Sequence, residues 1–143
     1  MRELRFLDSS VFLHAYLKPR RALRPEEKRV KESAKSLLSR VDKGKDKVLI
    51  SVVHLSEILN IVESRLGLKE SIGLLSRILS LQNIMVVGVN KEDYEKAIAI
   101  ASHYNVSVND AIAYIKMKEF NLNEIYTFDK HFKNLPGTKI VQK

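Results

Sequence analysis

Four carboxylate residues, Asp8, Glu57, Asp110 and Asp129, stand at positions from which a parallel sheet can bring them together. Asp8 and Asp129 each come at the end of a short apolar run that is typical of a buried strand. Glu57 comes early in a helical pattern after another such run, and Asp110 opens a further helix. Because ligands of open α/β folds bind beyond the carboxyl ends of the strands, we expect the four acids to meet there.

Carboxylates gathered at one point repel each other strongly unless a cation joins them. Hard oxygen donors of this kind suit Mg²⁺ or Mn²⁺. Two such ions about 4 Å apart hold both the attacking water and the leaving oxygen in phosphodiester cleavage. The acids therefore predict a site for one or two Mg²⁺ or Mn²⁺ ions and indicate hydrolysis of phosphodiester bonds.

The composition is that of a basic globular protein. The 143 residues are enough for one domain with an ordinary core, and we predict a single domain over residues 1–143. The 25 Lys and Arg outnumber the 17 Asp and Glu, which gives a net charge of +8. A basic surface around an acidic site suits a polyanion such as nucleic acid. Basic proteins without such a partner are common, so charge alone favours neither alternative.

Several classes of protein are excluded by simple features of the chain. It has no cysteine, which rules out disulfides, thiolate metal sites and cysteine nucleophiles. No run of about 18 apolar residues predicts a transmembrane helix. The beginning of the chain lacks the apolar segment of a secretory signal, and we expect a cytoplasmic protein.

The hydrophobic pattern predicts how these residues are positioned. Helices alternate with strands that are separated by crossovers, which predicts a three-layer α/β/α sandwich with a mostly parallel central sheet. A basic, proline-bounded loop is expected at residues 18–25. The predicted strands are 4–8, 47–51, 84–89, 124–128 and an edge strand at 139–141. The predicted helices are 10–17, 25–43, 53–66, 68–81, 91–104 and about 107–120, with a short turn at 130–134.

Each acid taken singly has an ordinary structural alternative. Asp8 and Asp129 are suitable N-caps for the segments that follow them. Asp110 fits a loose capping box and gains from the dipole at a helix start. Glu57 fits a solvated polar stripe that it would share with His54. Only the joint placement of the four acids favours a common site.

The segments around these acids resemble, in the right order, those of the PIN domain family. The resemblance covers essentially the whole chain and is closest to the small single-domain PIN ribonucleases, including toxins of the VapBC toxin–antitoxin type. The four segments are Phe6-Leu7-Asp8-Ser9-Ser10-Val11-Phe12, Ser51-Val52-Val53-His54-Leu55-Ser56-Glu57-Ile58-Leu59, Asn109-Asp110-Ala111-Ile112-Ala113 and Thr127-Phe128-Asp129-Lys130-His131-Phe132-Lys133-Asn134-Leu135-Pro136-Gly137.

The resemblance implies a metal-dependent endoribonuclease in which Asp8, Glu57, Asp110 and Asp129 bind the metal and catalyse cleavage. It implies that Ser10 and Thr127 carry hydroxyls that orient the acids or a water molecule at the metal. It also implies an RNA substrate and raises the role of a toxin with an antitoxin protein as partner. The preference for RNA over DNA rests on the resemblance alone.

Two rival functions remain at this point. One is a catalytically silent RNA-binding or scaffold module of the same fold, against which the presence of all four acids speaks. The other is a phosphatase with an aspartate nucleophile, a chemistry that usually needs a second Asp two residues after the first, where this chain has Ser10. None of the four histidines has the spacing of a metal-binding motif, and we predict none as a ligand.

The predicted helical hairpin at residues 53–81 carries more apolar positions than one helix layer should bury. Such surplus apolar surface marks an interface. We therefore predict a two-fold homodimer, with a deeper monomer core as the alternative. The apolar positions are Leu55, Ile61, Leu68, Ile72, Leu75 and Leu79.

Overall fold

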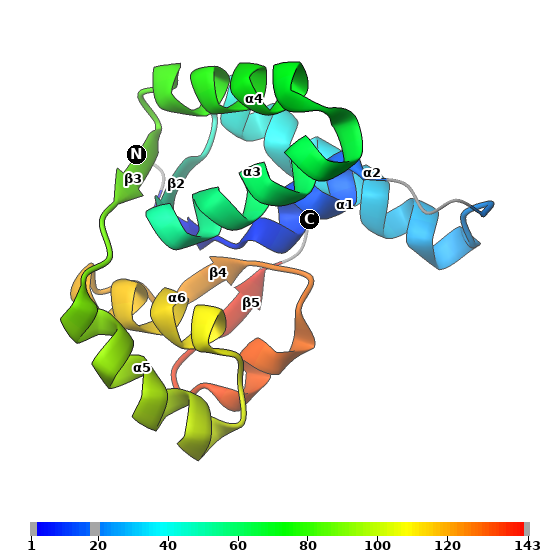
Figure 1. Cartoon of the computed structure of the whole chain (residues 1–143). Helices are drawn as coiled ribbons and strands as arrows, with labels where there is room; N and C mark the ends of the chain where they lie inside the picture. Colours follow the sequence, from blue (N-terminus) through cyan, green and yellow to red (C-terminus); the bar gives the residue numbers. More distant parts are fainter. Residues whose placement is uncertain (1–2, 18–20, 142–143) are drawn as a thin grey trace.

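The computed structural model describes residues 3–17 and 21–141, and within them the elements follow the predicted order (Figure 1). Residues 18–20 of the predicted basic loop lie outside the described residues. The strands are β1 (Leu4–Leu7), β2 (Lys47–Ser51), β3 (Ile84–Val87), β4 (Glu124–Tyr126) and β5 (Lys139–Val141). The helices are α1 (Ser9–Tyr16), α2 (Pro25–Asp42), α3 (Val52–Leu66), α4 (Leu68–Ser80), α5 (Lys91–Tyr104), α6 (Val108–Glu119) and the 3₁₀ helix η1 (Lys130–Asn134).

The five strands form one sheet in the order β3-β2-β1-β4-β5, and every neighbouring pair is parallel. The prediction of a parallel α/β sheet is confirmed. From β1 the chain first builds the sheet outward through β2 and β3, and it then returns to add β4 and β5 on the other side of β1. The order of strands therefore reverses between β1 and β4, and such a reversal opens a crevice at the carboxyl edge.

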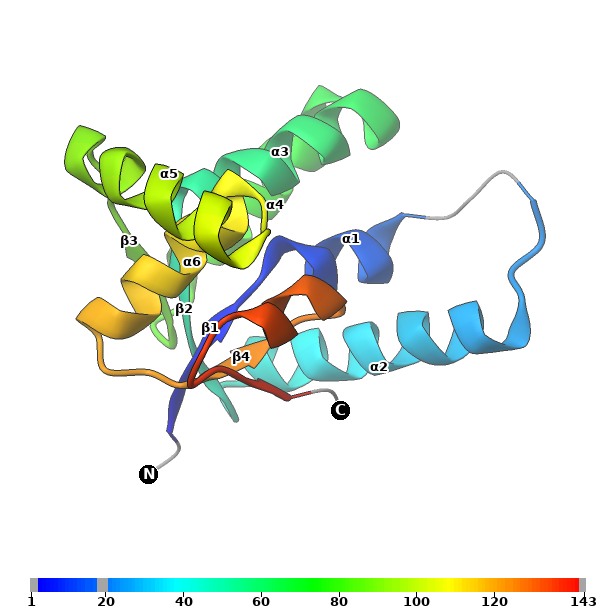
Figure 2. The same cartoon turned by 90° about the horizontal axis from the view of Figure 1, so that it is seen from below.

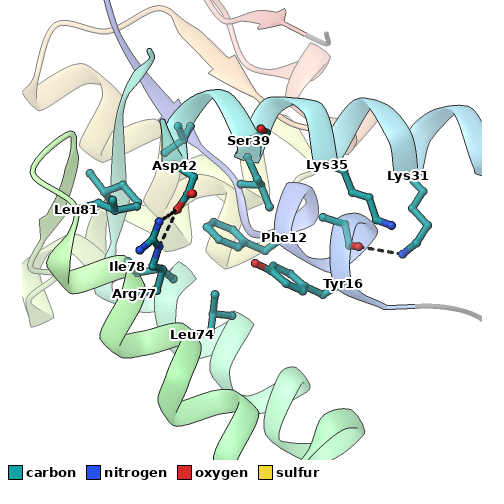
Figure 3. A pocket seen from close by; sticks show the side chains of 14 residues that line it. Phe12, Tyr16, Lys31, Lys35, Ser39, Asp42, Leu74, Arg77, Ile78 and Leu81 are labelled. Atoms are coloured by element: carbon teal, nitrogen blue, oxygen red, sulfur yellow. Dashed lines mark hydrogen bonds and ion pairs between the residues drawn. The ribbon is translucent and has the colours of Figure 1, made fainter. Parts of the chain in front are cut away.

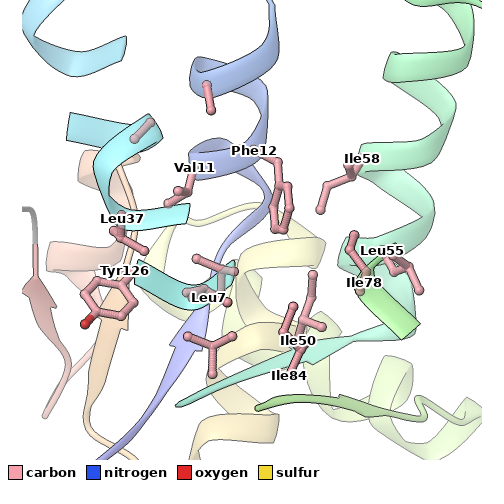
Figure 4. Packing of buried hydrophobic residues seen from close by; sticks show 14 of the residues in the cluster. Leu7, Val11, Phe12, Leu37, Ile50, Leu55, Ile58, Ile78, Ile84 and Tyr126 are labelled. Carbon is pink, nitrogen blue, oxygen red and sulfur yellow. The ribbon is translucent and has the colours of Figure 1, made fainter. Parts of the chain in front are cut away.

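Helices cover both faces of the sheet because successive side chains of a strand point to opposite faces. Leu7, Ile50 and Tyr126 belong to a core cluster formed with α1, α2, α3 and α4 (Figure 4). Their neighbours in the strands, Phe6 and Leu49 among them, belong to a second cluster with α6 and η1. Figure 2 shows α2 below the sheet and α5 with α6 above it. The three-layer sandwich follows from this alternation.

Local signals set the helix ends close to the predicted positions. Asn90 accepts a hydrogen bond from the backbone of Asp93 and begins α5 in a capping box. Asn105 closes α5 in the left-handed region at φ 55°. Gly67 separates α3 from α4 with φ 100°, a conformation that favours glycine. The strands β3 and β4 end two residues earlier than predicted, so Thr127 lies just beyond the sheet.

The far end of α1 is tied to α2 by a buried lysine. The Nζ atom of Lys31 donates to the backbone oxygens of His14, Ala15 and Leu17 at 3.3, 2.9 and 3.2 Å. Carbonyls at the end of a helix generally lack intrahelical donors, and a cation there also matches the helix dipole. Lys31 therefore fixes the position of α1, whose first residues lie at the acidic edge of the sheet.

The helical hairpin of α3 and α4 is only partly as expected. Leu55 is 8% exposed and lies in the core, so its assignment to a surplus surface is wrong. By contrast, Leu68, Ile72 and Leu79 on α4 are 61, 58 and 60% exposed. In the part of the chain that the structure describes, no helix is both long and apolar enough to span a bilayer.

Candidate metal centre

Three of the predicted acids come together at the carboxyl edge of the sheet. Asp8 follows β1 directly, Asp110 lies in the first turn of α6, and Asp129 begins η1 after β4. Carboxylate oxygens of Asp110 and Asp129 lie within 4.8 Å of each other, and the charges of Asp129 and Asp8 act on Asp110. Glu57, from α3, is held at the side of this group by residues next to Asp8 and Asp110.

Asp8 is 4% exposed and occupies the N-cap position of α1, but its side chain makes no capping hydrogen bond. Instead, its Oδ2 accepts a hydrogen bond from the Thr127 hydroxyl at 2.8 Å. The carboxylate is thus turned away from the helix it precedes. Burying a carboxylate without a cationic partner costs free energy. A carboxylate kept in such a position therefore indicates a functional role.

The two predicted hydroxyls lie together beside Asp8. Ser10 Oγ and Thr127 Oγ1 are 3.2 Å apart. Ser10 Oγ also accepts from the backbone N–H of Phe128 at 3.0 Å, and Thr127 Oγ1 accepts from that of Asp129 at 2.9 Å. These bonds join α1 to the segment after β4, so the pair fixes Asp8 and Asp129 relative to each other.

Glu57 is held by two neutral donors from separate elements. Its Oε1 accepts from the Ser9 hydroxyl, and its Oε2 accepts from the side-chain amide of Asn109 at 3.2 Å. The alternative of a solvated polar stripe is wrong because His54 is fully buried. Ser9 and Asn109 were not among the predicted site residues. Their positions next to Asp8 and Asp110 were the available signal.

Asp110 is the acid whose protonation the site changes most. Burial, together with the nearby charges of Asp129 and Asp8, raises the pKa of Asp110 to about 7. The backbone N–H of Asp110 donates to the Ser107 hydroxyl at 3.0 Å, so Ser107 caps α6. The first turn of α6 has no capping box, and the carboxyl of Asp110 interacts with the side chains of Asp129 and Ser107. A cation at this point would remove the repulsion that raises the pKa.

Asp129 combines a structural and a site role. Its Oδ1 accepts from the backbone N–H of His131 at 2.9 Å, which makes it the N-cap of η1. The Nδ1 atom of His131 lies 3.0 Å from the same oxygen. Ligand atoms of Asp110, Asp129 and His131 lie within 4.8 Å of one another, a spacing that can hold a metal ion. His131 was not predicted as a ligand because neither partner has the spacing of a metal-binding motif. Asp110 is distant in the sequence, and Asp129 is only two positions away.

The donor set fits a divalent cation. Across residues 3–17 and 21–141, no Lys or Arg forms an ion pair with Asp8, Glu57, Asp110 or Asp129. His54 lies near Asp8 and His131 near Asp129, and burial lowers the pKa of His54. Negative charge that no fixed cation neutralises is what Mg²⁺ and Mn²⁺ sites offer.

A second recess lies away from the acids, between α1, α2 and α4 (Figure 3). Its volume is about 560 Å³. Phe12 and Tyr16 from α1 and Leu74 from α4 line it, and Tyr16 is 46% exposed. The ion pair between Arg77 and Asp42 closes one end, which leaves a largely apolar recess open to solvent.

The sheet is parallel, its strand order reverses between β1 and β4, and acids lie at its carboxyl edge. These features define the class of α/β proteins with a site suited to divalent metals. Residues 5–137 match the PIN domain family, and the chain belongs to this family. PIN proteins use divalent metals and are generally nucleases. No protein of curated function matches the chain.

Solved structures of similar fold include VapC toxins. VapC20 of Mycobacterium tuberculosis, a toxin that cleaves the sarcin–ricin loop, is 20% identical with a TM-score of 0.74 over 99% of this chain and 100% of its own. A toxin–antitoxin complex from Klebsiella pneumoniae is 17% identical with a TM-score of 0.64 over 96% and 95%. VapBC2 from Rickettsia felis, bound to a promoter DNA fragment, is 14% identical with a TM-score of 0.64 over 99% and 100%.

Proposed function

We propose that this protein is a cytoplasmic endoribonuclease that needs Mg²⁺ or Mn²⁺. The observation that carries the proposal is a cluster of buried and half-buried acids that neutral donors hold and that, among the described residues, have no Lys or Arg partner. Membership of the PIN family supports nuclease chemistry at such a cluster. The net charge of +8 supports a polyanionic substrate.

Each residue of the site has a role in this proposal. Asp8, Glu57, Asp110 and Asp129 would hold the metal, which supplies Lewis-acid activation of water and of the phosphate. Thr127 orients Asp8, and Ser10 fixes the segment that carries Thr127. The raised pKa of Asp110 keeps it partly protonated near neutral pH before metal binds, so metal binding releases a proton.

The decisive experiment replaces one acid without changing its shape. Asp8→Asn keeps the hydrogen bond with Thr127 within reach but removes the charge, and we expect a folded protein without Mg²⁺-dependent cleavage of RNA. Asp42→Asn, which makes the same change at an exposed position, is the matched control and should cleave at the parent rate. A folded Asp8→Asn variant that cuts RNA at the parent rate would refute the proposal.

The cleavage assay and a trapping experiment separate the rival functions. A silent RNA-binding module would bind RNA and show no difference in cleavage between Mg²⁺ and a chelator. A phosphatase with an Asp nucleophile would form a phosphoaspartate that can be trapped, and the Asn variant would lose it.

We further propose that the chain is the toxin of a toxin–antitoxin pair. Two proteins of similar fold were solved as toxin–antitoxin assemblies, which supports the proposal.

We assign a segment of the antitoxin to the apolar recess between α1, α2 and α4. With the protein encoded by a small neighbouring reading frame, Tyr16→Glu should weaken binding at least tenfold. Tyr94→Glu on α5, where Tyr94 is 41% exposed, is the control that should not. Equal binding by both variants would remove the recess from the proposal.

A homodimer through α4 is also proposed. Leu68, Ile72 and Leu79 expose apolar surface along this helix, and self-association would bury it. Sedimentation at micromolar concentration should give twice the 16.4 kDa mass of the chain, and Ile72→Lys should give a monomer. A parent protein that sediments as a monomer would refute the dimer.

A further inference from the structure

His54 lies behind the acidic cluster, and the roles assigned above do not use it. Its side chain is fully buried, and its ring meets that of Phe6 edge-on with 5.0 Å between centroids. The Nε2 atom lies 4.0 Å from Oδ1 of Asp8, which is too long for a hydrogen bond. Among the described residues this nitrogen has no hydrogen-bond partner. A buried polar atom without a partner costs free energy and calls for an explanation.

Ser51 decides which ring nitrogen carries the hydrogen. Its Oγ accepts from the backbone N–H of His54 at 3.2 Å and lies 2.6 Å from Nδ1. Ser51 is fully buried, and Nδ1 is the acceptor that the described residues offer to its hydroxyl hydrogen. If Nδ1 carried the hydrogen, that hydroxyl would have no acceptor, and a bare Nε2 lone pair would face the Asp8 carboxylate. The neutral ring therefore carries its hydrogen on Nε2.

The surroundings of the ring agree with a neutral N–H donor. Burial is the main cause that lowers the pKa of His54, whereas the charges of Asp8 and Glu57 and the backbone of Asn109, a further acceptor beside the ring, raise it. These three opposing groups are all hydrogen-bond acceptors. The ring thus lies between apolar contacts on one side and acceptors of the metal centre on the other.

We infer that His54 is a positioning residue whose Nε2–H is directed at Oδ1 of Asp8 and orients this carboxylate for metal binding. Thr127 donates to the other oxygen of Asp8 at 2.8 Å, so one oxygen of this carboxylate is held by a hydrogen bond and the other faces Nε2 across 4.0 Å. Both groups are neutral, and the charge of Asp8 stays available to a cation. This inference rests on the proposed function, because it assigns Asp8 to the metal. Partners of this kind typically change metal affinity or activity by about 10- to 100-fold.

The first test measures Mn²⁺ affinity of the full-length, metal-free protein. His54→Leu keeps an apolar side chain in the buried site but removes the donor, and it should weaken Mn²⁺ binding about 10- to 100-fold. His54→Gln places an amide N–H near the position of Nε2 and should restore most of the affinity. A purely structural role would not distinguish Gln from Leu in this way. His103→Leu, at an exposed position on α5, is the control and should bind like the parent.

The second test needs neither metal nor a variant. Nitrogen-15 NMR of the parent protein labelled at histidine should show the neutral Nε2–H tautomer for His54. A Nδ1–H tautomer overturns the inference even if His54→Leu does not fold. Unchanged Mn²⁺ affinity in a folded His54→Leu protein also overturns it and leaves the proposed function intact. A parent protein that binds no Mn²⁺ refutes the proposed metal site, and the positioning role falls with it.

Discussion

Replacing Asp110 with Asn should stabilise the metal-free protein, and more so at high pH. The folded state raises the pKa of Asp110 from 3.8 to about 7. A pKa that is raised on folding contributes stability below the unfolded value, and this stability is lost as the pH rises through the folded value. The metal-free parent should therefore lose stability between about pH 4 and about pH 7. Asn carries no charge and does not titrate, so the variant should lack this loss.

The magnitude follows from the same pKa difference. At 1.36 kcal/mol for each pKa unit, the interval from 3.8 to about 7 corresponds to an upper limit of about 4 kcal/mol. Relaxation of the site and mobile ions reduce this value, and we expect about 2 kcal/mol near pH 8. For a chain of this size, that is roughly 6 °C in the melting temperature.

Thermal unfolding in the presence of a chelator provides the assay. The melting temperature of Asp110→Asn should exceed that of the parent at about pH 8, and the two should converge at about pH 4. Glu32→Gln removes one negative charge at an exposed position on α2 and serves as the control. A difference between Asp110→Asn and the parent that is the same at both pH values would refute the reasoning. So would a variant that is less stable at both.

Variants at three further positions test residues of the site and the lysine at the far end of α1. Glu57→Gln should show a smaller rise in melting temperature on adding Mn²⁺ than the parent, for which saturation a hundredfold above the dissociation constant adds about 2.7 kcal/mol. Thr127→Val should cost about 1–3 kcal/mol in chemical unfolding because the half-buried N–H of Asp129 loses its acceptor, whereas Thr127→Ser should restore it. Lys31→Met should lower stability by about 1–3 kcal/mol because three carbonyls at the end of α1 lose their donor, and an unchanged unfolding midpoint would contradict that role.

The sequence predicted the frame of the site because its signals are local. Short apolar runs with crossovers between them define a parallel sheet, and Asp8 and Asp129 directly follow such runs. Caps such as Asn90 and the stop at Gly67 depend on backbone groups within a few residues. These features do not require knowledge of how the helices are rotated.

The details that depend on helix rotation could not be predicted in this way. Hydrophobic periodicity shows which apolar side chains of α3 face the sheet, but it does not decide among the polar ones. His54 lies inside and Ser56 outside because of how α3 sits on β1 and β2. Lys116 is likewise buried in an ion pair with Asp93 at 2.8 Å, a contact between two helices that neither helix specifies alone.

The position of β4 next to β1 has a consequence for the synthesis of the protein. The hydrogen bond from Thr127 to Asp8 joins residues that are 119 positions apart in the chain. A chain still growing on the ribosome can form β1, β2 and β3 with their helices, but it lacks both Thr127 and Asp129 at the crevice. If the protein cuts RNA, it therefore cannot do so until its last site residues have been made and have paired beside β1. The strand order thus makes completion of the acidic cluster one of the last steps in the synthesis and folding of the chain.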